Sequence, residues 1–204
     1  MNKEVDVCIV GAGPGGALLA YLLAKKKLSV LLLEQTNQLA RSFRGEHMNE
    51  EGEAILKKHG LFDKVADLGL LKMERLEYWL NGQLVKTITP NPAVGHLGIH
   101  VPQGHLLQAI IEAAQAYDTF EHCLNARVTE LLQDTAGPYN GVRAICNGKE
   151  LTVTCGLVVG ADGRYSTVRK KANIHTTIRK HGYELLWARI PAPTDWSHPL
   201  KWHS

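Results

Sequence analysis

A glycine-rich segment close to the amino terminus constrains the fold of this chain more than any other feature. Residues 11–16 read GAGPGG and fit the pattern G-x-G-x-x-G. The Val- and Ile-rich run at residues 5–10 predicts a strand before this segment, and the Ala- and Leu-rich residues 17–26 predict a buried helix after it. Residues 29–33 are mostly apolar, which is typical of a parallel strand covered on both faces. This order predicts a β-α-β unit whose first turn is the glycine-rich segment.

Each glycine of this turn is expected to have its own physical role. Gly11 allows the tight turn, Gly13 lets the backbone approach a pyrophosphate, and Gly16 lets the helix pack closely on the sheet. Backbone N–H groups at the start of the helix, including that of Gly15, would face the phosphate charge. Glu34 ends the second strand and can accept hydrogen bonds from the ribose hydroxyls of adenosine. We therefore predict a site for the ADP part of a dinucleotide, with a ligand-free glycine turn as the alternative.

Downstream of this unit the sequence changes to a mixture of helices and antiparallel strands. Asn81-Gly82 is a strong hairpin signal, because a type I′ turn needs positive φ at both central residues. Asn140-Gly141 and Asn147-Gly148 predict the turns of a three-stranded antiparallel meander. Helices are predicted over residues 50–58, 61–68, 103–117 and 166–172. Strands are predicted over residues 76–80, 84–88, 98–101, 127–133, 142–146, 151–155, 157–160 and 183–190.

Two further local signals mark a loop and the ends of a helix. The polar segment at residues 35–48 is too long for a simple connector and is a candidate functional loop. Asn49 is a suitable N-cap for the helix at residues 50–58, and Gly60 is a suitable left-handed stop.

Composition excludes several classes of function. Lys and Arg number 23 against 20 acidic residues, so the formal net charge of +3 gives no electrostatic case for nucleic acid. Residues 7–24 are uncharged, but glycines interrupt them and acidic residues precede them, so we expect no membrane span and no signal peptide. His96, His100 and His105 do not share one helical face, and we expect no metal site.

The four cysteines show no spacing that indicates a metal site or a disulfide framework. Most of them lie in apolar, strand-like stretches, and none forms a C-x-x-C pair: Cys8, Cys123, Cys146 and Cys155. We therefore expect reduced, partly buried thiols in a cytoplasmic protein.

Three segments outside the glycine turn resemble motifs of the aromatic-hydroxylase family of FAD-dependent monooxygenases, the p-hydroxybenzoate hydroxylase-like enzymes. Residues 44–46 read Arg-Gly-Glu, as in the family's R-G-E segment. Residues 158–169 read VVGADGRYSTVR and are similar to the family's D-G motif. Residues 101–107 match the segment before a helix in which an Arg or Gln contacts the cofactor. The resemblance implies FAD, which the glycine turn alone does not distinguish from NAD.

The resemblance also implies roles for particular residues. Arg44 would lie against the adenosine part of FAD, and Gln103 would bind the pyrophosphate or ribityl region. The backbone of Val128 would hold the adenine edge. Asp162 would reach the ribityl and pyrophosphate region, and Gly163 would allow its close approach. No residue in this chain is a convincing catalytic acid or base.

The implied fold is α/β, a Rossmann-like FAD-binding domain with a three-stranded antiparallel meander and part of a β-rich substrate domain. Residues 1–75 and 102–175 would form the two segments of the FAD-binding domain. Residues 76–101 would be a hairpin and strand of the substrate domain, and residues 176–204 its next part. The family's Gly-Asp motif, which binds the flavin end of FAD, has no counterpart in the sequence. We therefore expect this chain alone to be inactive.

The implied reaction uses NAD(P)H and O₂ to hydroxylate an aromatic or phenol-like small molecule. A related FAD-dependent reductase or halogenase and a non-catalytic FAD-binding fragment are retained as alternatives. Self-association as a homo-oligomer, through an exposed edge of the incomplete fold, is an alternative to a monomer.

Overall fold

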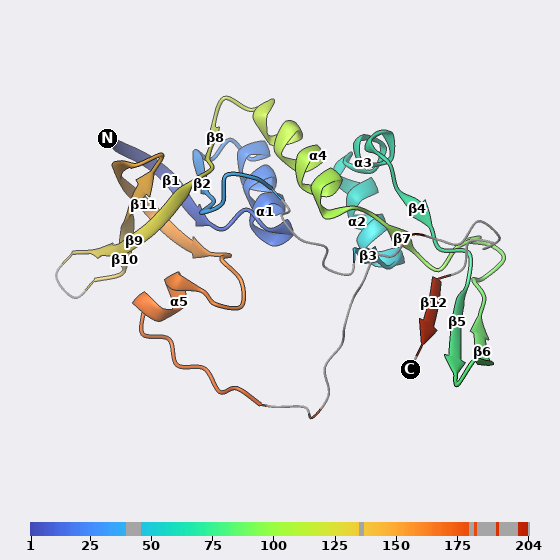
Figure 1. The fold of residues 1–204 in the computed structure, drawn as a ribbon. Coiled ribbons are helices and arrows are strands. Elements are labelled where there is room, and N and C mark those ends of the chain that lie inside the picture. Colours follow the sequence, from blue (N-terminus) through green and yellow to red (C-terminus); the bar gives the residue numbers. More distant parts are fainter. Residues whose placement is uncertain (40–45, 135–136, 180–181, 183–190, 192–199, 204) are drawn as a thin grey trace. The chain divides into compact units, whose positions relative to one another are not determined.

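The computed structural model describes residues 1–39, 46–134, 137–179, 182, 191 and 200–203 and contains two compact units (Figure 1). The first unit comprises Met1–Arg41 and Leu107–Glu184, and the second comprises Ser42–Leu106 and Leu185–Ser204. The strand predicted over residues 183–190 lies outside the described residues.

The first unit is built on a six-stranded sheet in the order β8-β2-β1-β11-β10-β9. Strand β1 pairs in parallel with β2 and β11, and β2 pairs in parallel with β8. Strands β9 and β10 complete an antiparallel meander with β11. The predicted fold class, a Rossmann-like domain with a three-stranded meander, is confirmed. The strands are β1 (Asn2–Val10), β2 (Val30–Leu33), β8 (Phe120–Cys123), β9 (Ala126–Gln133), β10 (Tyr139–Cys146) and β11 (Lys149–Gly160).

The register places the carboxyl ends of the four parallel strands at one edge of the sheet. Val10 pairs with Leu33 on one side and with Gly160 on the other, and Leu33 also pairs with Cys123. Loops that leave these four strand ends therefore start side by side. In open α/β sheets this edge is where ligands bind.

Opposite faces of the parallel strands are covered by different elements. Helix α1 (Pro14–Lys25) packs on β1, β2 and β8 with its small residues Ala17, Ala20 and Ala24 buried. On the other face, residues of the central strands share one core with residues of the meander. This core includes Cys8, Leu31, Leu33, Val128, Ala144, Val153 and, from helix α5 (Thr167–Lys171), Val168. Burial of a side chain such as Leu31 or Leu33 contributes about 1.5–3 kcal/mol.

In its described residues, the second unit contains two short sheets, two complete helices and the start of a third. Helix α2 (Glu50–His59) begins after Asn49, whose side chain accepts from the Gly52 N–H at 3.0 Å, and it ends at Gly60 with φ 72°. Both predicted caps are confirmed. The other elements are α3 (Phe62–Leu68), the sheet β3 (His47–Met48), β7 (Ile99–His100) and β4 (Leu71–Lys72), and the sheet β12 (Leu200–His203), β5 (Leu76–Leu80) and β6 (Gln83–Ile88). Helix α4 (Gln103–Gln115) begins in the second unit and continues into the first.

Two of the three Asn-Gly turn predictions are confirmed and one is wrong. Asn81-Gly82 joins β5 to β6 and Asn147-Gly148 joins β10 to β11, and both residues of each pair have positive φ. Asn140 and Gly141 instead lie inside β10. A Cβ on Gly141 would come closer than 3.0 Å to the Val153 carbonyl oxygen, and the register of β9 and β10 shifts beside it. This glycine therefore serves a close strand contact at a bulge and not a turn.

The structure also corrects the strand boundaries near the end of the first unit. Residues 151–155 and 157–160 form one continuous strand, β11, whose first half pairs with β10 and whose residues 152–160 pair with β1. Leu157 is 54% exposed, so the second half is not the buried strand that its apolar sequence predicts. Strand β8 was not predicted.

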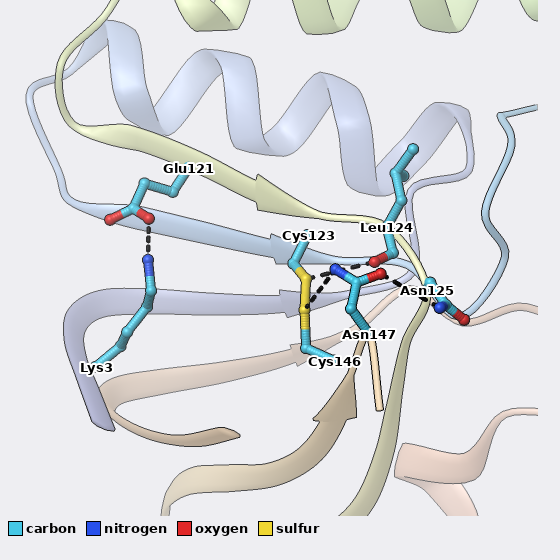
Figure 2. The surroundings of a disulfide bond; sticks show 7 residues. All are labelled: Lys3, Glu121, Cys123, Leu124, Asn125, Cys146 and Asn147. Atoms are coloured by element: carbon cyan, nitrogen blue, oxygen red, sulfur yellow. Dashed lines mark hydrogen bonds and ion pairs between the residues drawn. A yellow bond between two sulfur atoms is a disulfide. The ribbon is translucent and has the colours of Figure 1, made fainter. Parts of the chain in front are cut away.

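The expectation of four reduced cysteines is wrong, because Cys123 and Cys146 form a disulfide (Figure 2). Cys8 and Cys155 are free and buried. The pair is distant in sequence and lies on strands that are not neighbours in the sheet, so spacing along the chain gave no signal for it. Within the described residues, none of the helices combines the length and the apolar character that a bilayer crossing requires.

Candidate dinucleotide-binding site

The glycine turn leaves β1 in a conformation that only glycine adopts readily. Gly11 has φ 106°, and a Cβ on it would lie 2.5 Å from the Ala161 carbonyl oxygen and 2.8 Å from the Asp162 Cα. The Gly11 N–H donates to the Leu33 carbonyl at 2.7 Å, and the Ala161 N–H donates to the Val10 carbonyl at 2.7 Å. The turn that follows β1 and the turn that follows β11 are therefore in direct contact.

Gly16 allows the close approach of α1 to this turn. A Cβ on Gly16 would come closer than 3.0 Å to the Gly11 carbonyl oxygen. This oxygen belongs to the backbone, so it cannot move without a shift of the turn. The helix start is thereby fixed against the end of β1. This is a packing requirement within the protein, independent of any ligand.

Three other glycines of the site border open space. Among the described residues, apart from the chain neighbours and the backbone of the same helix, no atom lies within 4 Å of a Cβ built on Gly13, Gly15 or Gly163. Helix α1 has no side-chain cap at Gly13 and no acidic residue in its first turn. The described residues thus leave space beside the start of the helix, where its first N–H groups and positive dipole end suit an anionic group such as a pyrophosphate.

Glu34 links the glycine turn to the end of β2. One carboxylate oxygen, Oε2, accepts from the Ala12 N–H at 2.9 Å. The other, Oε1, accepts from the Thr36 N–H at 2.9 Å and from the Thr36 hydroxyl at 3.0 Å. A carboxylate offers about four acceptor positions, and the hydrogen bonds within the described residues use three of them. The hydrogen bond between Ala12 and Glu34 was not predicted, and the sequence gives no indication of it.

Val128 lies on β9, at the edge of the six-stranded sheet. Its side chain is 7% exposed and belongs to the core, so only its backbone is available to a ligand. The Ala126 N–H donates to the Glu34 carbonyl at 2.8 Å, which places the start of β9 beside Glu34. The structure thus brings the predicted ribose-binding and adenine-binding residues to the same corner of the first unit.

Asp162 has a structural role that was not predicted. Its Oδ1 accepts from the Ser166 hydroxyl at 2.5 Å, and its Oδ2 accepts from the N–H groups of Thr167 and Val168 at 2.6 and 3.0 Å. Ser166 in turn accepts from the Arg169 N–H at 2.9 Å. The carboxylate therefore caps the start of α5 and shapes the turn that carries Gly163.

This arrangement predicts that Asp162→Ala destabilises the first unit. Loss of the cap leaves two backbone donors of α5 unpaired, which costs about 1–2 kcal/mol. The melting temperature should fall by about 2–8 °C, because one kcal/mol shifts it by about 2–4 °C in a chain of this size. Thermal unfolding followed by circular dichroism measures this change. Asp118→Ala, at an exposed position, is the control, and an equal shift in the two variants would contradict the capping role.

Gln103 and Arg44 are the other two predicted cofactor contacts. Gln103 belongs to the second unit, where its backbone N–H donates to the Glu46 carboxylate at 3.2 Å. Arg44 lies outside the described residues.

The three clustered histidines have separate environments. His96 is buried, accepts from the Gly98 N–H and lies 3.5 Å from the Glu53 carboxylate. His100 pairs across the strands with His47, and burial lowers the pKa of both. His105 lies 2.9 Å from the Gly69 carbonyl. In the part of the chain that the structure describes, no three metal-ligating side chains form a group.

Comparison with known proteins identifies the family. The model of the FAD binding domain family matches residues 4–202. The 6-methylpretetramide 4-monooxygenase of Streptomyces rimosus is 34% identical over 94% of this chain and 46% of its own length. A digeranylgeranylglycerophospholipid reductase of Methanosarcina acetivorans is 33% identical over 88% of this chain and 42% of its own. The structure of Pseudomonas aeruginosa PqsL in complex with 2-aminobenzoylacetate matches 87% of this chain and 48% of PqsL, with 28% identity and a TM-score of 0.73.

The chain belongs to the FAD-binding domain family of flavin-dependent oxidoreductases. The predicted relationship to FAD-dependent monooxygenases is confirmed. The chain spans about half the length of the curated relatives it matches.

Proposed function

We propose that this chain is the FAD-binding part of a monooxygenase that uses NAD(P)H and O₂ to hydroxylate an aromatic or phenol-like small molecule. The observation that carries the proposal is the open space over Gly13 and Gly15, at the carboxyl end of the parallel strands. The protein atoms leave room there for a group that would be in contact with the helix start. Glu34 and the start of β9 border the same corner.

Different residues of the first unit would bind different groups of FAD. The N–H groups at the start of α1 would bind the pyrophosphate, and the Glu34 carboxylate would accept from a ribose hydroxyl. The Val128 backbone would contact the adenine edge, and the Asp162-Gly163 turn would lie against the pyrophosphate and ribityl region. We assign Arg44 to the adenosine and Gln103 to the pyrophosphate or ribityl chain. When bound, FAD supplies the redox chemistry that the protein side chains lack.

A reductase is the second candidate, because a reductase is similar to this chain at almost the same identity as a monooxygenase. Assays on a version of the protein that spans the length of these relatives distinguish them. A hydroxylase consumes NAD(P)H faster when its phenolic substrate is present. Consumption that does not respond to a panel of phenolic compounds would favour the reductase. We place the protein in the cytoplasm and expect no nucleic-acid partner.

Replacement of Glu34 by Ala should weaken FAD binding about 10- to 100-fold, since a hydrogen bond to a charged group contributes about 1.5–3 kcal/mol. The change removes the carboxylate that would accept from the ribose hydroxyl, and it also removes the hydrogen bond to the Ala12 N–H. Titration of FAD fluorescence measures the dissociation constant. Glu130→Ala is the matched control, because Glu130 is exposed and its ion pair with Arg143 is at the surface. Equal affinities of the two variants would contradict the role of Glu34.

A further inference from the structure

The disulfide of the first unit lies between the parallel strands and the meander. Cys123 ends β8 and Cys146 ends β10, two strands that β2, β1 and β11 separate in the sheet (Figure 2). The bond therefore joins the two halves of the sheet across the core that they share. Backbone and side chains around it add weaker links, including a bond from the Asn147 N–H to the Asn125 carbonyl at 3.0 Å.

Two backbone hydrogen bonds connect this disulfide to the proposed ADP site. The Glu34 N–H donates to the Cys123 carbonyl at 2.9 Å, and the Glu34 carbonyl accepts from the Ala126 N–H at 2.8 Å. The segment that starts at Cys123 thus holds the Glu34 backbone from both sides. The Glu34 side chain in turn holds the glycine turn through the Ala12 N–H. Any movement of Cys123 is therefore transmitted to Glu34 through bonds of normal length.

The surroundings of the two sulfurs suit attack by an external thiolate. Cys123 is partly exposed, whereas Cys146 is only 6% exposed. Two exposed residues flank the disulfide: Asn125 near Cys123 and Asn147 next to Cys146. The Asn147 side-chain amide lies 3.7 Å from the Cys146 Sγ and donates to it (Figure 2). Attack on the Cys123 Sγ would make Cys146 the leaving group, and this donor would stabilise its thiolate.

We propose that Cys123–Cys146 is a reversible redox switch that controls the affinity of the first unit for the ADP part of FAD. The proposal rests on the proposed function of this site. A dithiol reductant attacks the Cys123 Sγ as a thiolate, forms a mixed disulfide and releases Cys146, which takes up a proton. The second thiol of the reductant then breaks the mixed disulfide and releases Cys123 as a thiol. Two electrons and two protons pass to the protein, and the dithiol becomes a disulfide. The reverse exchange restores the Cys123–Cys146 disulfide.

The other two cysteines serve as an internal reference. Cys8 and Cys155 are 0% and 5% exposed and are shielded from reagents in the folded chain. A hydrogen bond from Cys8 lowers the pKa of Cys155. After denaturation both thiols react with an alkylating reagent, so the total thiol count reports the state of Cys123 and Cys146.

The test uses the full 204-residue chain, oxidised in air or reduced with dithiothreitol. Mass spectrometry after denaturing alkylation should count two modified cysteines in the oxidised chain and four in the reduced chain. FAD fluorescence titration should give about 10-fold weaker binding after reduction, equivalent to about 1.4 kcal/mol. The double variant Cys123→Ser/Cys146→Ser should bind like the reduced chain and should not respond to dithiothreitol.

Amide hydrogen exchange separates failure of the switch from failure of the site. Reduction should accelerate exchange at the N–H groups of Ala12, Glu34 and Ala126, with or without FAD. Absence of FAD binding in both redox states would overturn the proposed function, and the exchange rates would then show whether the disulfide still controls this corner. Four alkylated cysteines in the oxidised chain would overturn the switch. So would measurable FAD binding with equal affinity in the two states.

Discussion

Replacement of Gly13 by Val should reduce FAD affinity about 100-fold or more while the chain remains folded. Apart from the chain neighbours, no atom of the described residues lies within 4 Å of a Cβ at this position, so we expect the side chain to fit without a clash in that part of the protein. The added methyl groups would occupy the volume that we assign to the pyrophosphate, and the loss of its hydrogen bonds at the helix start costs several kcal/mol. FAD fluorescence titration measures the affinity, and circular dichroism monitors the fold.

Stability and a graded series serve as controls for this variant. Gly13 has φ −66°, which Val adopts without strain, and the poorer N-cap costs about 1 kcal/mol. The melting temperature should therefore fall by only about 2–4 °C. Gly13→Ala should give an intermediate affinity, because one methyl group fills less of the same space. Wild-type affinity in Gly13→Val would contradict the placement of the pyrophosphate.

Gly16→Ala should have the opposite profile, with a large loss of stability. Its Cβ would meet the Gly11 carbonyl oxygen closer than 3.0 Å, so the helix start or the turn must shift. Overpacking of this kind costs about 1–3 kcal/mol, or about 2–12 °C in melting temperature. Thermal unfolding without any cofactor measures the effect.

Gly15→Ala is the matched control on the same helix. Outside its own helix, its Cβ would meet no atom of the described residues within 4 Å, and Ala is favoured over Gly in a helix by about 0.5–1 kcal/mol. Its melting temperature should be unchanged or higher. Equal losses of stability in Gly15→Ala and Gly16→Ala would contradict the predicted stability cost of a side chain between Gly16 and the turn.

The features that the sequence predicts well are those that one or two residues determine locally. Asn49 caps the start of α2 because its side chain accepts a hydrogen bond from a helix N–H. Gly60 ends the helix because its backbone adopts the left-handed conformation. Asn81-Gly82 makes a hairpin because both residues reach positive φ. The glycine turn belongs to the same group, since the strand, turn and helix around it are contiguous in the chain.

The features that the sequence does not predict depend on contacts between distant segments. Gly141 carries a turn-like sequence, but its role follows from the Val153 carbonyl on the neighbouring strand. The Cys123–Cys146 disulfide follows from the way the meander shares a core with the parallel strands. Asp162 stands in a motif that implies a cofactor contact, and only the structure shows that its carboxylate caps α5.

The central claim is that the first unit binds the ADP part of FAD at the carboxyl end of its parallel strands. Titration of the purified chain with FAD, followed by displacement with ADP, tests this claim most directly. We predict saturable binding of one FAD per chain and full displacement by ADP, because most of the residues that we assign to the cofactor would bind its ADP half. A folded chain that binds neither FAD nor ADP would contradict the account.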